Sequence, residues 1–227
     1  MSARMLMRCL SFILVCVATT TQIFAQSNTN SDFVLARLKY HGGGDWYNDP
    51  SAIPNLLAFM RAHSNVPAGQ NETVVEIMDD ELFTFPFLFM TGHGRVQFSG
   101  EEAARLRNYL ASGGFLYADD DYGMDESFRA EIAKIFPDAE LREIPFTHEI
   151  YRNHFRFPNG VPKIHEHDGG PPQAFGLFYE GRMVLYYTFN TNISDGWADP
   201  NVHEDPEEIR KLALEMGTNI VVYALTH

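Results

Sequence analysis

Acidic and imidazole side chains follow several predicted strands of this chain. Because the carboxyl ends of parallel strands meet at one edge of a sheet, we expect these side chains to share a groove there. Imidazole and carboxylate groups in one groove suit either a divalent ion or general acid–base chemistry on a polar substrate. The residues concerned are Asp45, His93, the triplet Asp119 to Asp121, and His148.

The three consecutive aspartates cannot all face one site. Successive side chains of an extended chain point to opposite sides, so either Asp119 and Asp121 or Asp120 alone faces the groove. Asp119 and Asp120 are candidate ligand-binding residues, and Asp120 is also a catalytic candidate together with His93 and His148. The alternative is that these aspartates cap a helix expected from about Asp125, or bind loop amides.

Three aromatic side chains on predicted loops could stack on the ring of a polar ligand. Trp46 and Tyr47 follow the glycines 42–44, and Trp197 lies in a loop predicted over 190–203. Flat rings beside carboxylates are typical of sugar sites, where the ring stacks and the acids form hydrogen bonds. The alternative is that these rings pack their loops onto the sheet.

A second set of histidines lies in a segment rich in proline and glycine. In an extended loop His165 and His167 share a face, so both are weak candidate ligands for a divalent metal; the sequence establishes no cofactor. The chain contains no second cluster at zinc-finger spacing.

The elements that position these residues centre on residues 85–122. A short apolar run over 87–90 predicts a buried strand, and Ser99 with Glu102 forms a capping-box pattern at the start of a helix. The glycines 113–114 end that helix, and a second apolar run follows over 115–118. A strand, a crossover helix and a strand form a parallel unit in nearly every known case.

The remaining elements extend this unit in both directions. We expect a first strand over 33–40, a helix capped by Asp49 or Ser51, and a strand over 73–78. A helix closed by Pro137, a strand over 141–144 and a hairpin around 180–181 follow. A helix from Asp205 covers the C-terminus. The pattern predicts one α/β domain over 32–227, a three-layer α/β/α sandwich with a mostly parallel sheet and a C-terminal hairpin plus helix.

Residues 1–25 have the features of a secretory signal peptide. Arg4 and Arg8 precede the apolar run 10–18, and Ala25 precedes the expected cleavage point. The run is too short for a membrane anchor, which needs about 20 apolar residues. Leu14 and Val15 lack the small residue expected before a lipoprotein cysteine at position 16. We therefore expect a secreted, periplasmic protein with a polar tail over 26–31 and no transmembrane segment after cleavage.

Cysteine content and charge exclude several classes of function. Both cysteines, Cys9 and Cys16, lie in the leader, so the mature chain has no thiol for a disulfide, a thiolate metal site or catalysis. The formal net charge of the whole chain is −13. Cleavage removes two of 17 basic residues and none of 30 acidic ones, which leaves −15. Such a balance disfavours nucleic acid and anionic membranes as partners.

Several spaced motifs occur along the mature chain. They are YHGGGDWYNDP, ELFTFPFLFMTGHG, FSGEEAARLRNYLASGGFLYADD, PFTHEIY, and EGRMVLYYTFN with a later GW. On these motifs the chain resembles a family of bacterial proteins, domain of unknown function 4159, along nearly all of its mature length. The resemblance implies a class I glutamine-amidotransferase-like fold with a flavodoxin-like sheet, and a bacterial envelope setting. More distant ThuA-like proteins suggest carbohydrate-related ligands by analogy.

The resemblance does not supply an activity. Amidotransferase chemistry needs a cysteine at the turn after a central strand, and here that turn reads Thr91-Gly92-His93-Gly94, which excludes cysteine-dependent glutamine hydrolysis.

Two functions of different class remain open. The favoured one is a binding module for a small polar, carbohydrate-like ligand or an envelope protein. The alternative is a metal-assisted or acid–base hydrolase, for which a histidine nitrogen should lie about 3 Å from an aspartate oxygen.

Overall fold

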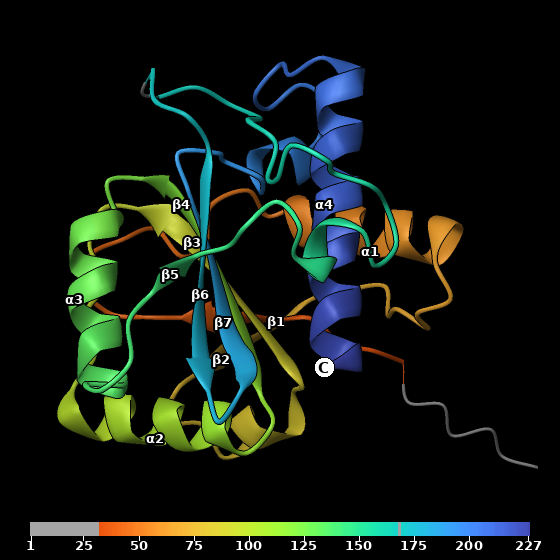
Figure 1. Ribbon diagram of the computed structural model, residues 1–227. Coiled ribbons are helices and arrows are strands. Elements are labelled where there is room, and N and C mark those ends of the chain that lie inside the picture. Colours follow the sequence, from red (N-terminus) through yellow and green to blue (C-terminus); the bar gives the residue numbers. More distant parts are fainter. Residues whose placement is uncertain (1–31, 168) are drawn as a thin grey trace, which may run out of the picture. The chain divides into compact units, whose positions relative to one another are not determined.

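The computed structural model describes residues 32–167 and 169–227, and Figure 1 shows their arrangement. The predicted signal peptide, the polar tail over 26–31 and Asp168 lie outside the described residues. The helices and strands, in chain order, are β1 (Ala36–Lys39), α1 (Ala52–His63), β2 (Thr73–Glu76), η1 (Asp80–Thr84), β3 (Phe87–His93), α2 (Gly100–Ala111), β4 (Phe115–Tyr122), α3 (Asp125–Ile135), β5 (Arg142–Glu143), η2 (Glu149–Tyr151), β6 (Gln173–Tyr179), β7 (Arg182–Phe189), η3 (Asp195–Trp197) and α4 (Glu207–Thr226).

The seven strands form one sheet in the order β2-β1-β3-β4-β7-β6-β5. Neighbouring strands from β2 to β7 pair in parallel, whereas β6 pairs antiparallel with both β7 and β5. The five parallel strands, taken in chain order, have the 2-1-3-4-5 order of flavodoxin-like sheets. In such sheets a ligand site lies outside the carboxyl ends of the strands, where the order reverses. Here the reversal falls between β1 and β3.

Residues 87–90 of strand β3 are all apolar because helices cover both faces of the sheet. Phe87 and Phe89 belong to one buried cluster, and Leu88 and Met90 belong to the other. A parallel strand buried on both faces is expected to be a continuous apolar run. The prediction that residues 87–90 form a central strand is confirmed.

The helices divide between the two faces and complete three layers. Helices α1 and α4 lie on one side of the sheet and α2 and α3 on the other, as Figure 1 shows. The predicted capping box at the start of α2 is present. The Ser99 side chain accepts a hydrogen bond from the Glu102 backbone, and the Glu102 carboxylate accepts one from the Ser99 backbone. The expected α/β sandwich, with its C-terminal hairpin β6–β7 and helix α4, is confirmed.

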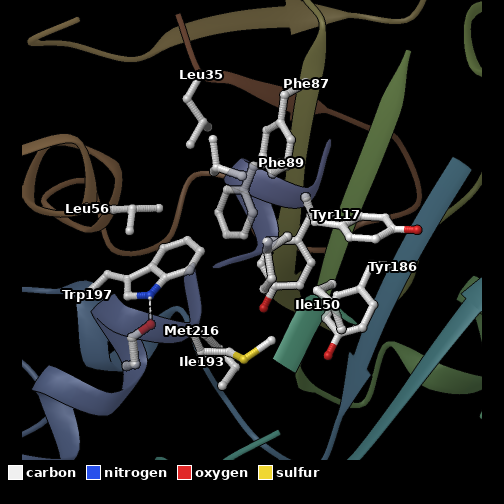
Figure 2. Close-up of a cluster of buried hydrophobic side chains, with 14 of the residues drawn as sticks. Leu35, Leu56, Phe87, Phe89, Tyr117, Ile150, Tyr186, Ile193, Trp197 and Met216 are labelled. Carbon is white, nitrogen blue, oxygen red and sulfur yellow. Dashed lines mark hydrogen bonds between the residues drawn. The ribbon is translucent and has the colours of Figure 1, made fainter. Parts of the chain in front are cut away.

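Trp197 lies within the core between the sheet and helices α1 and α4, as Figure 2 shows. Its ring centroid is 5.2 Å from that of Phe89, and its indole N–H donates to the carbonyl of Ala213 at 2.9 Å. Gly217 of α4 provides the space, because a Cβ there would lie 2.6 Å from the indole ring. Burial of so large a side chain stabilises the fold by about 2–3 kcal/mol or more. The short helix η3 is thereby fixed to α4.

Strand β4 is longer than its apolar run and includes all three aspartates, which the sequence had suggested lie on a loop. The neighbouring strands explain the difference. In the ladder, Asp119 pairs with Thr91 of β3 and Thr188 of β7, so hydroxyl groups line the polar end of the strand. Strand β1 is shorter than predicted and begins at Ala36. Among the described helices, none is both long enough and apolar enough to cross a bilayer.

Candidate functional site

His93, the last residue of β3, is held against Asp45 on the loop after β1. The backbone N–H of His93 donates to one carboxylate oxygen of Asp45, and Nδ1 of His93 lies 3.1 Å from the other oxygen. Gly92 permits this approach. Its φ is +147°, and a Cβ there would lie 2.4 Å from the Tyr40 hydroxyl and 3.1 Å from Asp45 Oδ1. Because the His93 side chain is 43% exposed, this imidazole–carboxylate pair reaches solvent.

Asp121 lies beside this pair near the end of β4, with its side chain 1% exposed. Its Oδ2 lies 3.3 Å from Nδ1 of His93 and accepts a hydrogen bond from the Asn48 amide. Its Oδ1 accepts one from the Asn192 amide at 3.0 Å. Neutral amides and an imidazole therefore surround a buried carboxylate, which is an arrangement that a cation would stabilise.

The two histidines of the loop before β6 face the same cluster. Nε2 of His167 lies 3.9 Å from Oδ1 of Asp121, and its ring centroid is 4.8 Å from that of Tyr122. The His165 ring centroid lies 5.1 Å from that of His167, and Nδ1 of His165 is 3.5 Å from a carboxylate oxygen of Asp205. The structure thus brings both candidate metal ligands to the edge where Asp45 and His93 lie.

A further group lies deeper in the same region. Nε2 of His203 lies 2.9 Å from Oδ2 of Asp49, and Nδ1 of His203 lies 3.9 Å from Oδ2 of Asp195. The Asn192 amide, which already donates to Asp121, lies 3.4 Å from Asp195 Oδ2. The loop 190–205 therefore connects two acidic groups that are far apart in sequence.

Three sets of ligand atoms lie close enough to hold a metal ion. The atoms of each set lie within 4.8 Å of one another. Imidazole and carboxylate donors without thiolate suit zinc, manganese or iron. The sets are His93 with Asp121 and His167, His165 with His167 and Asp195, and Asp49 with Asp195 and His203.

The electrostatics of this cluster are strongly negative. Among the described residues, each ion pair made by its five aspartates is with a histidine. Burial, and then the nearby charge of Asp121, raises the pKa of the Asp195 carboxyl far above its usual range. The hydrogen bond that the His203 ring donates to the Asp49 carboxylate raises the pKa of His203. The aspartates are Asp45, Asp49, Asp121, Asp195 and Asp205.

The space beside these groups is small. A pocket lined by Asp121, Tyr122, His167 and Asn192 has a volume of about 20 Å³, which is room for one ion or water molecule. A larger groove of about 390 Å³ is lined by residues that include Gly42, Arg95 and Ser127. A small ion therefore fits the first space, and a larger substrate fits the second.

Asp119 and Asp120 are occupied by the fold. The Asp119 carboxylate accepts hydrogen bonds from the Thr188 hydroxyl and from the backbone and hydroxyl of Ser194. Asp120 points to the other face, where it accepts from the backbone N–H of Met124 and from the Tyr187 hydroxyl. Burial raises the pKa of each carboxyl to about 6. The alternative reading, in which these two aspartates bind amides, matches their contacts.

The structure separates Trp197 and His148 from the cluster, whereas Trp46 and Tyr47 adjoin it in the chain. Trp197 is 1% exposed within the core, so its ring cannot stack on a ligand. His148 precedes η2, and its ring centroid lies 5.4 Å from that of Tyr223 near the end of α4. The chain after β5 crosses toward α4, which carries His148 away. Trp46 and Tyr47 follow Asp45 and contact each other edge to face, and Tyr47 is 64% exposed.

Several residues of the cluster were not candidates from the sequence. Asp49 was expected as a helix cap, but its carboxylate binds His203 instead. Asp121 was one of two options on β4, and Asp195 and His203 lay in a loop without periodicity. The signal that could have found them is the spacing of Asp195, His203 and Asp205 within one short loop that follows a strand of the sheet.

One comparison with known proteins identifies a family, and its description names no activity. A family model described as a domain of unknown function, number 4159, matches residues 34–225. A comparison with curated proteins found no match.

Proposed function

We propose, on the premise that this chain belongs to the domain of unknown function 4159 family, that it is a metal-dependent hydrolase of the bacterial envelope. The family description names no activity, so the proposal depends on the site alone. It selects the hydrolytic alternative over the binding module that the sequence favoured.

The observation that carries the proposal is the group of two imidazoles and one carboxylate at the carboxyl edge. His93 and His167 flank the buried Asp121, and their side chains are 43% and 32% exposed. Catalytic zinc sites use three protein ligands and leave a position for water or substrate. A site with one buried and two partly exposed ligands fits that pattern.

Asp45 supplies a feature that metal-binding histidines commonly have. Its Oδ2 lies 3.1 Å from Nδ1 of His93. The hydrolase hypothesis drawn from the sequence expects such a distance between a histidine nitrogen and an aspartate oxygen. A carboxylate that accepts a hydrogen bond from an imidazole N–H fixes the orientation of the ring, and metal-binding histidines commonly have such a partner.

The chemistry that such a site supports is attack by an activated water molecule. A bound divalent ion lowers the pKa of its water to about 7 and polarises the bond under attack. Arg95 lies two residues after His93 in the chain and lines the larger groove with Ser127. A cationic side chain in that groove favours a polar substrate with an anionic group.

Metal reconstitution tests the proposal directly. The purified chain, stripped with EDTA, should hydrolyse p-nitrophenyl phosphate or p-nitrophenyl acetate only after Zn²⁺ or Mn²⁺ is restored. His93→Ala and His167→Ala should lower the metal-dependent rate at least tenfold. His63→Ala is the matched control, because the exposed side chain of this α1 residue contacts the carbonyl and the ring of Phe59, away from the proposed ligands. Equal hydrolysis rates for the metal-free chain and for the fully metal-loaded chain would exclude a metal-dependent hydrolase.

The binding module remains a second candidate because of one exposed ring. Tyr47 is 64% exposed and lies two residues from Asp45, where a polar ligand or an envelope protein could contact both. This function predicts a metal-loaded chain that binds its partner and turns nothing over. Isothermal titration with simple sugars, together with the rate assay, separates the two candidates.

We also propose that the chain is exported to the periplasm. Support comes from the charged start, apolar run and Ala25 of the leader. Mass spectrometry of the protein from a periplasmic extract should give a chain that begins at Gln26. A chain that begins at Met1 and remains in the cytoplasm would overturn this proposal.

A further inference from the structure

We infer that Asp49, Asp195 and His203 hold a second divalent cation, and that this ion fastens the loop 190–205 to the loop after β1. The inference goes beyond the proposed function, because the ion is a structural one with ligands other than His93, Asp121 and His167. It adds a second ion to the chain whether or not the chain catalyses a reaction.

The three ligands come from separate parts of the chain and meet around one point. Asp49 precedes α1, Asp195 begins η3, and His203 lies on the loop before α4. Their ligand atoms all lie within 4.8 Å of one another. One cation bound to this set would connect the loop after β1 to both ends of the loop that carries Asp195 and His203.

An unpartnered oxygen points to a cation independently of this spacing. The Asp195 side chain is only 1% exposed. Its buried Oδ1 has no hydrogen-bond partner among the described residues. A buried carboxylate without partners is costly unless a cation or donor satisfies it. Oδ2 of Asp205 and Oδ1 of Asn48, both in the same cluster, also lack a partner among these residues.

Protonated His203 alone does not satisfy this group. Its single charge would face two carboxylates, with Nε2 2.9 Å from Asp49 and Nδ1 3.9 Å from Asp195. The distance to Asp195 exceeds a normal hydrogen bond, and Oδ1 of Asp195 would still have no partner. A divalent cation supplies two charges and accepts oxygen and nitrogen ligands together.

The degree of burial distinguishes this second position from the first. The ligand side chains are 11%, 1% and 22% exposed for Asp49, Asp195 and His203. Both imidazoles of the first set are more exposed. Structural metal sites are closed, whereas catalytic sites keep an open position. We therefore expect the second ion to leave more slowly and to matter more for the order of the loop.

Metal counting on the purified chain tests the inference. After equilibration with Zn²⁺ and passage through a desalting column, plasma mass spectrometry should find two zinc ions per chain. His203→Ala and Asp49→Asn should each lose the second ion and retain the first. His93→Ala should lose the first ion and retain the second. His63→Ala is the matched control and should retain two. EDTA should remove one ion from the parent at least tenfold more slowly than the other.

The possible counts separate the two proposals. One ion in the parent that His93→Ala removes would overturn the second site and leave the proposed function standing. No retained zinc would overturn both. Two ions in both His203→Ala and Asp49→Asn would place the second ion elsewhere and overturn the assignment. Circular dichroism of both variants identifies a folding defect, and if one variant unfolds the count of the other decides.

Discussion

Two buried carboxylates in this molecule have opposite surroundings. Asp119 is 0% exposed and Asp195 is 2% exposed. Asp119 accepts three hydrogen bonds from Thr188 and Ser194. Oδ2 of Asp195 accepts a long hydrogen bond of 3.4 Å from the Asn192 amide and lies 3.9 Å from Nδ1 of His203, and Oδ1 has no hydrogen-bond partner among the described residues. Only the second carboxylate is left for something outside the protein chain.

The comparison shows that hydrogen-bond partners, and not burial, distinguish the acid that the fold satisfies from the acid that we propose as a cation ligand. The residue before Asp195 makes the point, because Ser194 gives both its backbone N–H and its hydroxyl to Asp119. Two adjacent residues of one loop thus serve different purposes. One completes the sheet core, and the other faces the histidines of the metal cluster.

The largest effect should follow from removal of the fully partnered acid. Asp119→Ala leaves the Thr188 hydroxyl and both Ser194 donors without their acceptor, so the free energy of unfolding should fall by about 3–5 kcal/mol. Urea unfolding of the metal-free chain, followed by circular dichroism, measures this loss. Asp138→Asn, at an exposed position, is the control and should change stability by about 0.5 kcal/mol at most. A loss below about 1 kcal/mol would end the contrast between the two acids.

Replacement of the under-partnered acid, Asp195, should raise the free energy of unfolding of the metal-free chain, whereas replacement of Asp119 lowers it. Folding raises the pKa of the Asp195 carboxyl above its ordinary value of 3.8. The contribution of this group to the free energy of unfolding is therefore most favourable below pH 3.8, and it is lost as the pH rises. In the metal-free chain, Asp195→Asn removes this loss. The stability of the variant relative to the parent should therefore rise between pH 4 and pH 8 by about 2 kcal/mol.

Thermal unfolding in EDTA at several pH values measures the difference for Asp195→Asn. Added Zn²⁺ should then stabilise the parent and reverse the order of the two proteins. A constant difference across this pH range would mean that Asp195 is already satisfied within the chain.

The smallest effect concerns a group one step from the metal. Asp45 orients His93 without occupying the ligand set, so Asp45→Asn should weaken Zn²⁺ binding at the first site by about tenfold, or about 1.4 kcal/mol. Competition with a chromogenic chelator measures this change. Binding at the second site should stay the same. An unchanged affinity would indicate that His93 needs no orienting carboxylate.

The sequence predicted the sheet because its strands are buried on both faces. The runs that include Phe87 and Phe115 are too short and too apolar to be anything but central strands, and the Ser99–Glu102 pair marks the start of α2. Alternation along β4 also holds, since Asp119 and Asp121 face one side and Asp120 the other. These features depend on local chemistry, which the sequence displays directly.

Membership of the cluster could not be predicted in the same way. Which aspartate of β4 is held by the core and which one faces the histidines depends on contacts with Ser194 and Asn192, which are more than 70 residues away along the chain. His148 follows a strand as His93 does, but the crossing toward α4 places it beside Tyr223. Such outcomes depend on loop paths, and a loop without periodicity gives no signal of its path.

The position of the two tryptophans has a practical consequence for optical measurements. Trp46 adjoins Asp45, and the core residue Trp197 lies two positions after Asp195. The chain has two tryptophans in all, so each reports on one of the proposed ion positions. Substitution of either indole by phenylalanine would leave a single native fluorophore. Metal uptake at the two positions could then be followed separately, in real time and without an added dye.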